Sequence, residues 1–280
     1  MRELVLTLSC SDRPGIVHAV SGFLAERDCN ILDSQQYRSP RTSTFFLRVH
    51  VDSPVAVADL RAQFGVVAEA FGMTWQMHAE AEQQRVLVLV SRMGHCLNDL
   101  LYRWRSGYLP GVVAAVASNH TDLQSLTATY DVPFHHVPVT PESRDEQESQ
   151  ILQLVDSLGV DLVVLARYMQ VLSPPFCNAL PGRIINIHHS FLPSFRGGRP
   201  YDQAYEHGVK LIGATAHYVT AQLDEGPIIE QEVARVGHAH EPEQLAAVGR
   251  DLECVALARA VRWHLEHRVL LDGQRTVVFP

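Results

Sequence analysis

Asn186 and His188 are the first residues in this sequence whose types and spacing could do chemistry. They follow Arg183-Ile184-Ile185, which predicts a strand, and ligands of open α/β sheets bind beyond the carboxyl ends of strands. Because side chains alternate along a strand, Asn186 and His188 point to one side and His189 to the other. This parity favours His188 as the working histidine. The alternative is a polar strand end without a catalytic role.

A second candidate is Asp224, in the segment QLDEGP at 222–227 between two predicted strands. Gly226-Pro227 favours a turn that fixes the backbone. A carboxylate held in such a loop can orient a histidine or activate a water molecule. The alternative is an ordinary acidic hairpin loop. His217, on the preceding strand, is either a packed core histidine or a supporting partner of the site.

Composition excludes several classes of protein. The 23 basic and 31 acidic residues give a net charge of −8, which argues against a general nucleic-acid binder. Five cysteines without a CxxC motif, no signal peptide and no apolar run of about 18 residues favour a cytoplasmic protein that does not enter membranes. His238 and His240 form an HxH pair without an evident third ligand, so we expect no metal site.

The first 80 residues predict a small domain of their own. Alternating apolar residues indicate strands and helical spacing indicates two helices, in the order βαββαβ of the ferredoxin-like unit. The expected strands are 3–10, 30–37, 44–51 and 73–81, and the expected helices are 16–24 and 57–71. The polar segment 81–84 is a plausible linker. We therefore expect domains at 1–82 and 85–280.

The remaining residues show a different pattern of apolar and polar residues. Short continuous apolar runs are typical of strands buried on both faces, and helical stretches separate most of them. The runs are 86–90, 112–117, 132–137, 162–165 and 184–187. This alternation predicts a doubly wound, mostly parallel α/β sheet. Further expected elements are helices at 200–207 and 241–267, strands at 211–219 and 228–236, and a hairpin at 269–279.

The stretch NIHHSFLPSFRGGRPYDQAYEHGVKLIGATAHYV, with LDEGPIIEQ after it, resembles the formyltransferase family that uses 10-formyltetrahydrofolate. The resemblance covers roughly residues 85–280, and Asn186, His188 and Asp224 match the spacing of that family's catalytic residues. LARYMQVLS, at 165–173, is similar to its folate-site segment. The implied substrate-binding residues there are Arg167, Met169, Gln170, Val171 and Leu172. The first 80 residues resemble an ACT domain, a regulatory βαββαβ module.

An ACT domain followed by a formyltransferase domain is similar to the deformylases of this family. The resemblance implies hydrolysis of 10-formyltetrahydrofolate to formate and tetrahydrofolate, which balances the one-carbon pool and supplies formate for purine synthesis. A relative that formylates glycinamide ribonucleotide holds its phosphate in a glycine- and serine-rich loop. Here that loop is RMGHCL, at 92–97, with one glycine, which favours water as the acceptor. His95, Cys96 and Leu97 of this loop are further substrate-binding candidates.

The resemblance also implies a mechanism. Attack on the formyl carbonyl creates an oxyanion, which Asn186 and His188 could stabilise as hydrogen-bond donors. Asp224 could accept a proton from the attacking water or keep His188 protonated. No cofactor is expected, because tetrahydrofolate is the carrier and leaving group. The relative has proline where His189 stands, so a contribution of His189 stays open. Alternatives are formyl transfer to an amine, a non-catalytic regulator that senses folate and an amino acid, and a metal-dependent hydrolase, which lacks ligands.

The ACT-like domain implies an amino-acid effector and a homo-oligomer. Backbone N–H groups at the start of the helix after residue 15 suit a carboxylate, and Asn30 could add a polar contact. The effector-binding candidates are Asp12, Arg13, Gly15, Ile16 and Asn30. Glycine and methionine are the first ligands to test. The alternative is a domain that only drives oligomerisation.

Overall fold

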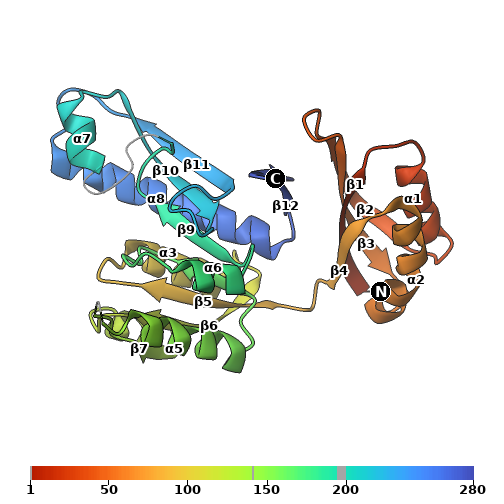
Figure 1. Ribbon diagram of the computed structural model, residues 1–280, viewed down its shortest axis with the longest axis horizontal. Helices are drawn as coiled ribbons and strands as arrows, with labels where there is room; N and C mark the ends of the chain where they lie inside the picture. The colour runs from red at the N-terminus through yellow and green to blue at the C-terminus, as the bar shows by residue number, and fades with distance from the viewer. Residues whose placement is uncertain (1, 141, 194–199) are drawn as a thin grey trace. The chain divides into compact units, whose positions relative to one another are not determined.

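The structure, a computed structural model, describes residues 2–140, 142–193 and 200–280. The chain divides into two compact units (Figure 1): Met1–Gln83 together with His267–Pro280, and Gln84–Glu266. The second unit holds the predicted catalytic residues. These units differ from the expected domains in one respect, because residues 267–280 group with the N-terminal unit. The functional domain boundary itself stays a prediction.

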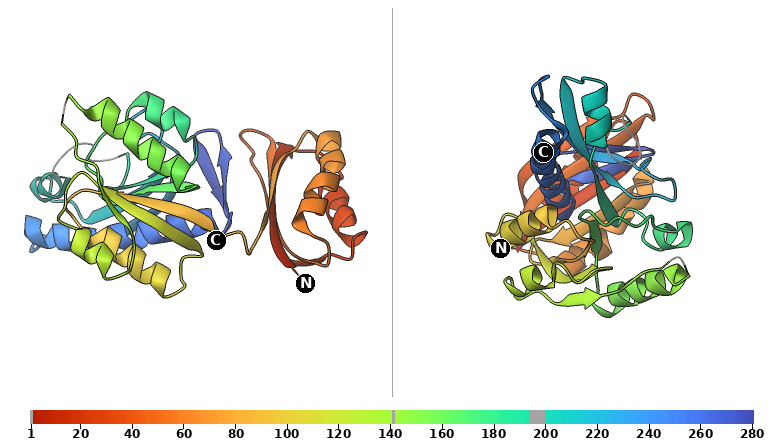
Figure 2. Two further views of the ribbon diagram at one scale, coloured as in Figure 1. Left: turned by 90° about the horizontal axis from the view of Figure 1, so that it is seen from below. Right: turned by 90° about the vertical axis from the view of Figure 1, so that its left-hand side faces the viewer.

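The first unit has the βαββαβ order that the sequence predicts. Its elements are β1 (Arg2–Ser11), α1 (Ile16–Ala25), β2 (Asn30–Arg38), β3 (Thr44–Ser53), α2 (Val57–Phe71) and β4 (Thr74–Ala79). The strands form an antiparallel sheet in the order β2-β3-β1-β4. Both helices cover one face of it (Figures 1 and 2). Leu4, Leu6 and Leu8 of β1 are buried in one core with Leu60 and Phe64 of α2.

The end of the chain completes this unit as a hairpin. Its strands, β12 (Val269–Asp272) and β13 (Arg275–Val278), are joined by an Asp-Gly turn in which Gly273 has φ +64°. The Asp272 carboxylate accepts hydrogen bonds from Ser39 Oγ and Thr42 Oγ1, both at 2.8 Å. The rings of His267 and His78 stack with centroids 3.7 Å apart. Side-chain contacts therefore fasten residues 267–280 to the N-terminal sheet.

The second unit contains a seven-stranded sheet. Its strands are β5 (Gln84–Val90), β6 (Gly111–Ser118), β7 (Phe134–His136), β8 (Leu162–Leu165), β9 (Ile184–His188), β10 (Leu211–Tyr218) and β11 (Ile228–Arg235). The order is β11-β10-β9-β8-β5-β6-β7, with parallel pairing from β9 to β7 and antiparallel pairing of β10 with both neighbours. This is the mostly parallel sheet expected from the sequence.

Helices cover both faces of this sheet, which explains the continuous apolar runs. They are α3 (His95–Arg105), α4 (Gln124–Ala128), α5 (Arg144–Ser157), α6 (Pro174–Ala179), α7 (Pro200–Glu206) and α8 (Pro242–Leu265). In β5, Val86 and Val88 pack toward α3 and α8, whereas Leu87 and Leu89 share a core with α5 and α6. Each strand residue is therefore buried on one face or the other.

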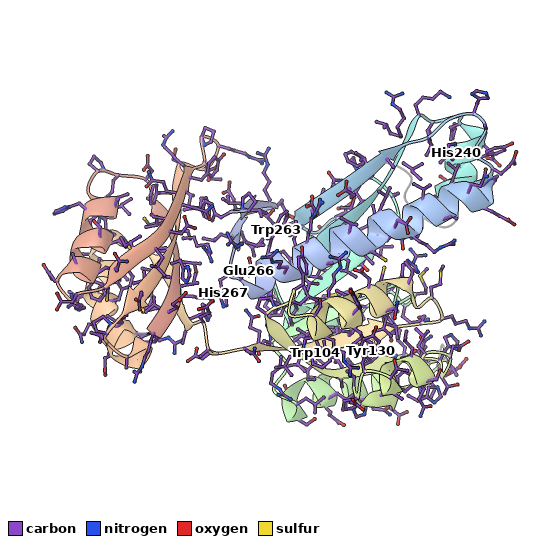
Figure 3. The ribbon with its side chains drawn as sticks, turned by 180° about the vertical axis from the view of Figure 1, so that it is seen from behind. Trp104, Tyr130, His240, Trp263, Glu266 and His267 are labelled. Carbon is purple, nitrogen blue, oxygen red and sulfur yellow. The ribbon has the colours of Figure 1, made fainter. Side chains whose placement is uncertain are left out.

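The longest helix, α8, begins where Glu241 and Gln244 form a capping box and Pro242 occupies the first turn. Figure 3 shows His240 before its start and Glu266 and His267 after its last turn. No helix within the described residues is long and apolar enough to cross a membrane.

The sheet reverses its order at β5, which lies between β6 and β8. Ligands of doubly wound sheets bind at such switch points, beyond the carboxyl ends of the strands. Here β5 ends at Val90, β8 at Leu165 and β9 at His188. The topology thus brings the loop after β8 and the polar end of β9 to the same edge.

Candidate active site

A cavity of about 340 Å³ opens at this edge. Its walls are the loop after β8, the end of β9 and the loop after β10. The residues predicted to bind the substrate on the β8 side all line it: Arg167, Met169, Gln170, Val171 and Leu172. Asn186, His188, His217 and Asp224 line it as well. Residues 194–199 of the stretch that resembles the formyltransferases lie outside the described residues.

Asn186 is oriented by His217, its partner across the β9–β10 ladder. His217 Nδ1 donates to the carbonyl oxygen of Tyr218 at 2.8 Å, so the proton sits on that nitrogen. Burial lowers the pKa of His217, and the neutral ring leaves Nε2 as an acceptor. Asn186 Nδ2 lies 3.3 Å from that Nε2. The amide NH₂ of Asn186 therefore faces His217, which is the contact that His217 would make as a supporting partner of the site.

His188 lies beside the Asp224 carboxylate in the cavity wall. Its Nδ1 is 3.4 Å from Asp224 Oδ2, and its side chain is buried. Burial would raise the pKa of Asp224, but the hydrogen bond and charge of His188 outweigh burial and lower it. His188 Nε2 has no hydrogen-bond partner within the described part of the chain. The arrangement leaves that nitrogen for a substrate and keeps an anionic group behind the ring.

The loop that carries Asp224 is fixed by close backbone contacts. Asp224 has φ +54°, in the left-handed region. A Cβ at Gly226 would lie 1.7 Å from the Tyr218 carbonyl oxygen, so only glycine fits there. The Tyr218 N–H donates to the Pro227 carbonyl at 2.9 Å. These contacts hold the loop against the end of β10, beside His217.

His189 lies closer to the site than the parity argument expects. Its ring stacks on that of His188, with centroids 4.9 Å apart and planes 19° apart, and it lines the cavity. Arg167 Nη1 lies 2.5 Å from His189 Nδ1. The strand ends at His188, so extended geometry no longer directs the residue that follows.

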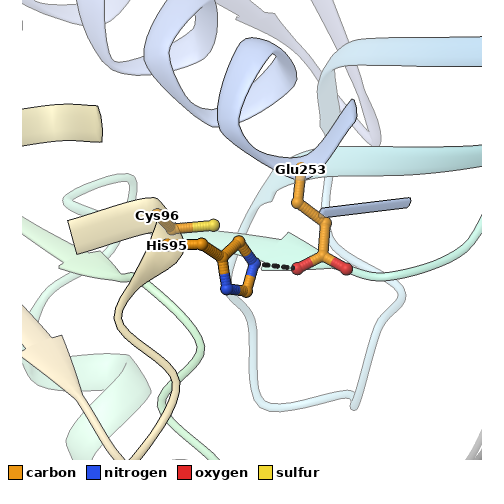
Figure 4. Close-up of side chains that lie close together, drawn as sticks. All are labelled: His95, Cys96 and Glu253. Carbon is orange, nitrogen blue, oxygen red and sulfur yellow. Dashed lines mark hydrogen bonds and ion pairs between the residues drawn. The ribbon is translucent and has the colours of Figure 1, made fainter. Parts of the chain in front are cut away.

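His95, Cys96 and Leu97 do not line the cavity in this structure. Cys96 and Leu97 are fully buried in the first turn of α3. A hydrogen bond with Cys254, together with burial, raises the pKa of the Cys96 thiol well above its usual range. His95 instead donates from Nε2 to Glu253 Oε2 at 2.8 Å (Figure 4).

Glu253, on α8, is buried and binds several side chains at once, and it was not among the residues predicted from the sequence. Besides His95, its Oε1 accepts from the Tyr201 hydroxyl at 2.8 Å, and its Oε2 lies 3.4 Å from Arg167 Nε. Burial would raise the pKa of Glu253, but the hydrogen bond from His95 and the charge of Arg167 lower it. The available signal was an acidic residue inside the apolar helical stretch LECVALARAV at 252–261.

The ligand atoms of His95, Cys96 and Glu253 lie within 4.8 Å of one another, a spacing that a metal ion could use (Figure 4). Arg167 already places a positive charge 3.4 Å from the same carboxylate. A metal cation would be repelled by this guanidinium. The geometry therefore favours an ion-pair cluster, and the expectation of no metal site stays a prediction.

The candidate effector residues of the N-terminal unit are separated in the structure. Asp12 pairs with Arg38 at 2.6 Å, and the Arg13 guanidinium lies 4.3 Å from the centre of the Phe71 ring. Gly15 precedes α1 with φ +94°, and Ile16 is buried. In the sheet register, Asn30 of β2 lies opposite Asp52 of β3, and Asp52 lies opposite Glu3 of β1. Asn30 is therefore level with the start of β1, whereas loop 12–15 follows its end. At about 3.3 Å per residue, Asn30 and loop 12–15 lie roughly 25 Å apart. One small ligand cannot touch both within one chain.

Comparison with known proteins gives two family matches. The formyl transferase model matches residues 84–261 and the ACT domain model matches residues 2–78. A formyltetrahydrofolate deformylase of Corynebacterium sp. (strain P-1) is 51% identical over 277 residues, which cover 98% of this chain and 97% of that protein.

Solved structures agree with these matches. The crystal structure of formyltetrahydrofolate deformylase from Burkholderia mallei is 49% identical, with a TM-score of 0.96 and all of both chains covered. Glycinamide ribonucleotide transformylase 1 from Symbiobacterium toebii is 34% identical, with a TM-score of 0.68 over 72% of this chain and 97% of its own.

Proposed function

Because the chain belongs to the formyltetrahydrofolate deformylase family, we propose that Asn186, His188 and Asp224 carry out its hydrolysis of 10-formyltetrahydrofolate. The observation that carries this assignment is that two groups of residues line the same cavity. The His188–Asp224 pair and the Asn186 amide form one part of its wall. Residues of the segment 165–172, which is similar to the family's folate-site segment, form the part beside them.

The substrate's formyl oxygen becomes negatively charged when water attacks. The donors aimed at this charge are the Asn186 NH₂, already turned by His217, and His188 Nε2, which has no partner among the described residues. Removing one such donor from an oxyanion site typically costs about 10²–10³ in rate. Because both groups are positioned before substrate binds, they need no rearrangement during the reaction.

Asp224 has two tasks in this scheme. As an ionised carboxylate it takes the proton of the attacking water, and from 3.4 Å away it orients the His188 ring through Nδ1. The water oxygen bonds to the formyl carbon, the bond from that carbon to N10 breaks, and N10 takes up a proton. The balanced products are tetrahydrofolate, formate and one proton.

The pterin and its neighbouring ring are proposed to lie against the loop after β8. Three large apolar side chains of the cavity wall are exposed: Met169, Val171 and Leu223. Exposed apolar groups at a cavity mouth suit a flat heterocycle, whose polar edge can pair with backbone groups of the loop.

The metabolic setting is part of the proposal. The formate released by this chain, in the cytoplasm, supplies purine synthesis and balances the one-carbon pool. An ACT domain is a place for control of that flux, by an amino acid that binds the N-terminal unit. For both Asn30 and loop 12–15 to contact one ligand across their separation of roughly 25 Å, the site must be built from two chains of a homo-oligomer.

The test of water as acceptor is a product balance. We expect 10-formyltetrahydrofolate alone to give formate and tetrahydrofolate in equal amounts, at a rate that glycinamide ribonucleotide does not raise. A reaction that requires glycinamide ribonucleotide and yields its formylated product would instead identify an amine-directed formyltransferase.

A further inference from the structure

We propose that Arg167 and His189 form a subsite for the formate product, anchored by Glu253. This inference rests on the proposed function and deepens it. Hydrolysis differs from formyl transfer to an amine in the charge of its product. Transfer leaves a neutral amide, whereas attack by water leaves a carboxylate and a proton. A hydrolytic site must therefore hold and release an anion that a transferase never makes.

The anion forms beside a group of its own sign. Asp224 lines the cavity beside His188, with its carboxylate 3.4 Å from His188 Nδ1, and its lowered pKa keeps it ionised. Formate produced at His188 is repelled by that carboxylate. A cation in the cavity wall away from Asp224 would draw the product off the catalytic residues.

Arg167 is such a cation, and it lines the same cavity. Its Nη1 contacts His189, whose ring stacks on that of His188. Only the His189 side chain therefore lies between the guanidinium and His188. Arg167 Nε is buried and faces Glu253, whereas Nη2 has only a 3.9 Å contact with Met93 Sδ among the described residues. The Nη2 N–H groups are therefore the ones that a carboxylate could bind.

The guanidinium is held in place before the reaction. Glu253, on α8, fixes Arg167 while also binding His95 of α3 and Tyr201 of α7. Gly249 makes room for this cluster, because a Cβ there would lie 2.0 Å from the Tyr201 hydroxyl oxygen. A buried carboxylate shared by three donors leaves the charge of Arg167 only partly neutralised. The subsite is thus built from four elements rather than from one mobile surface side chain.

The first test is product inhibition by sodium formate, with sodium chloride at equal ionic strength as reference. Formate should inhibit wild-type turnover, and Arg167→Gln should weaken that inhibition at least tenfold. The matched control is Arg259→Gln, which removes the same charge from an exposed site paired with Glu230 and Glu232. Its inhibition constant should equal that of wild type. Equal formate inhibition in Arg167→Gln and Arg259→Gln would overturn the proposal.

A second measurement does not depend on turnover or on the folding of one variant. ¹³C-labelled formate should show line broadening with wild-type protein, and nitrate, a planar anion, should relieve it where chloride does not. His189→Gln should reduce the broadening. If the protein hydrolyses its substrate yet formate neither inhibits nor broadens, the subsite alone is wrong. If it does not hydrolyse 10-formyltetrahydrofolate, the proposed function fails, whatever formate binding shows.

Discussion

Each nitrogen of His188, the proposed catalytic histidine, has a different environment. His188 Nδ1 faces Asp224, and Nε2 faces no described partner. A neighbouring histidine, His189, contacts the face of the ring instead. A hydrogen bond defines a role in proton transfer and orientation, whereas stacking mainly restricts where the ring can lie. The two histidines should therefore contribute unequally to catalysis.

We predict that His188→Ala lowers kcat by about 10²–10³, the typical value of one oxyanion donor. His189→Ala should lower kcat by no more than about tenfold, because it removes packing and leaves both nitrogens of His188 in place. Steady-state rates of both variants, beside thermal melts, provide the comparison. A reversed order would show that the working histidine is His189.

At the residue level the sequence predicts the site unevenly. Asn186, His188 and Asp224 are identified by spacing and by their positions after strands, and all three meet in one cavity. Glu253 is not identified from the sequence, because its hydrogen-bond partners His95 and Tyr201 come close to it only in the folded chain. The stacking of His189 on His188 also depends on where the strand ends, which periodicity fixes only to within a few residues.

At the level of elements, the loop between β10 and β11 decides where Asp224 lies. Its backbone passes so close to Tyr218 that residue 226 has no room for a side chain. Gly226→Ala must push the loop away from β10, and Asp224 two residues earlier moves with it. Since a misplacement of about 1 Å can cost about 10²-fold, we predict a loss of kcat near that size.

The matched control for this prediction is Gly237→Ala, because a Cβ there meets nothing closer than His240 Nδ1 at 3.8 Å. Initial rates at saturating substrate measure the effect. Near-wild-type turnover of Gly226→Ala would mean that the loop position does not set the position of the carboxylate.

Helix α8 contributes a pH-dependent stability through Glu253. The folded-state pKa of Glu253 is lowered from its ordinary 4.5, so its charge stabilises the fold above that value. This stabilisation is lost as pH falls through the folded-state pKa. We predict that Glu253→Gln lowers the free energy of unfolding at pH 7 by on the order of 3 kcal/mol, because Arg167 is left without its buried partner.

The difference between wild type and Glu253→Gln should shrink as pH is lowered below about 4.5, the ordinary value for this side chain. Denaturant melts between pH 3 and pH 7 measure it. Glu243→Gln, the same change at an exposed site in the first turn of α8, should alter stability by less than about 0.5 kcal/mol throughout. A constant difference for Glu253→Gln across the range would contradict the linkage.

The elements themselves were predictable where a pattern was long or its ends were marked. The continuous runs predicted the buried strands, and the Asp-Gly turn predicted the hairpin β12–β13. Short helices such as α4 and α6, of five and six residues, span fewer than two turns and show little periodicity. The attachment of the hairpin to the first unit could not be predicted, because it depends on contacts of Asp272 across more than 200 positions of the sequence.

At the scale of the whole molecule, two separate segments of the chain form the N-terminal unit, and one continuous segment forms the second unit. The chain leaves the N-terminal unit at Gln83 and returns at His267, directly after the helix that carries Glu253. A protein that begins at residue 84 would leave the hairpin at 267–280 without its partners, Ser39 and Thr42. Control by the N-terminal unit is therefore best tested in the intact chain with point variants.

We predict that an amino acid, with glycine and methionine tested first, binds the intact protein and changes its activity. Asp12→Ala and Asn30→Ala should each reduce binding, although the two residues lie at opposite ends of the sheet, because two chains contribute to one site. Calorimetry with all twenty amino acids, repeated with both variants, measures this. Loss in only one variant would place the site within one chain, and no binding at all would remove the effector.

The central claim is that the Asp224 carboxylate activates water for attack on the formyl group. The most direct measurement is formate release from 10-formyltetrahydrofolate in ¹⁸O-labelled water by wild type, Asp224→Asn and Glu225→Gln, an exposed neighbour in the same loop. Formate from wild type should carry one ¹⁸O atom, and Asp224→Asn should release it about 10²–10⁴ times more slowly with an unchanged thermal melt. Glu225→Gln should stay within about tenfold of wild type, as expected for an exposed side chain. Release by a folded Asp224→Asn at the wild-type rate would contradict the account.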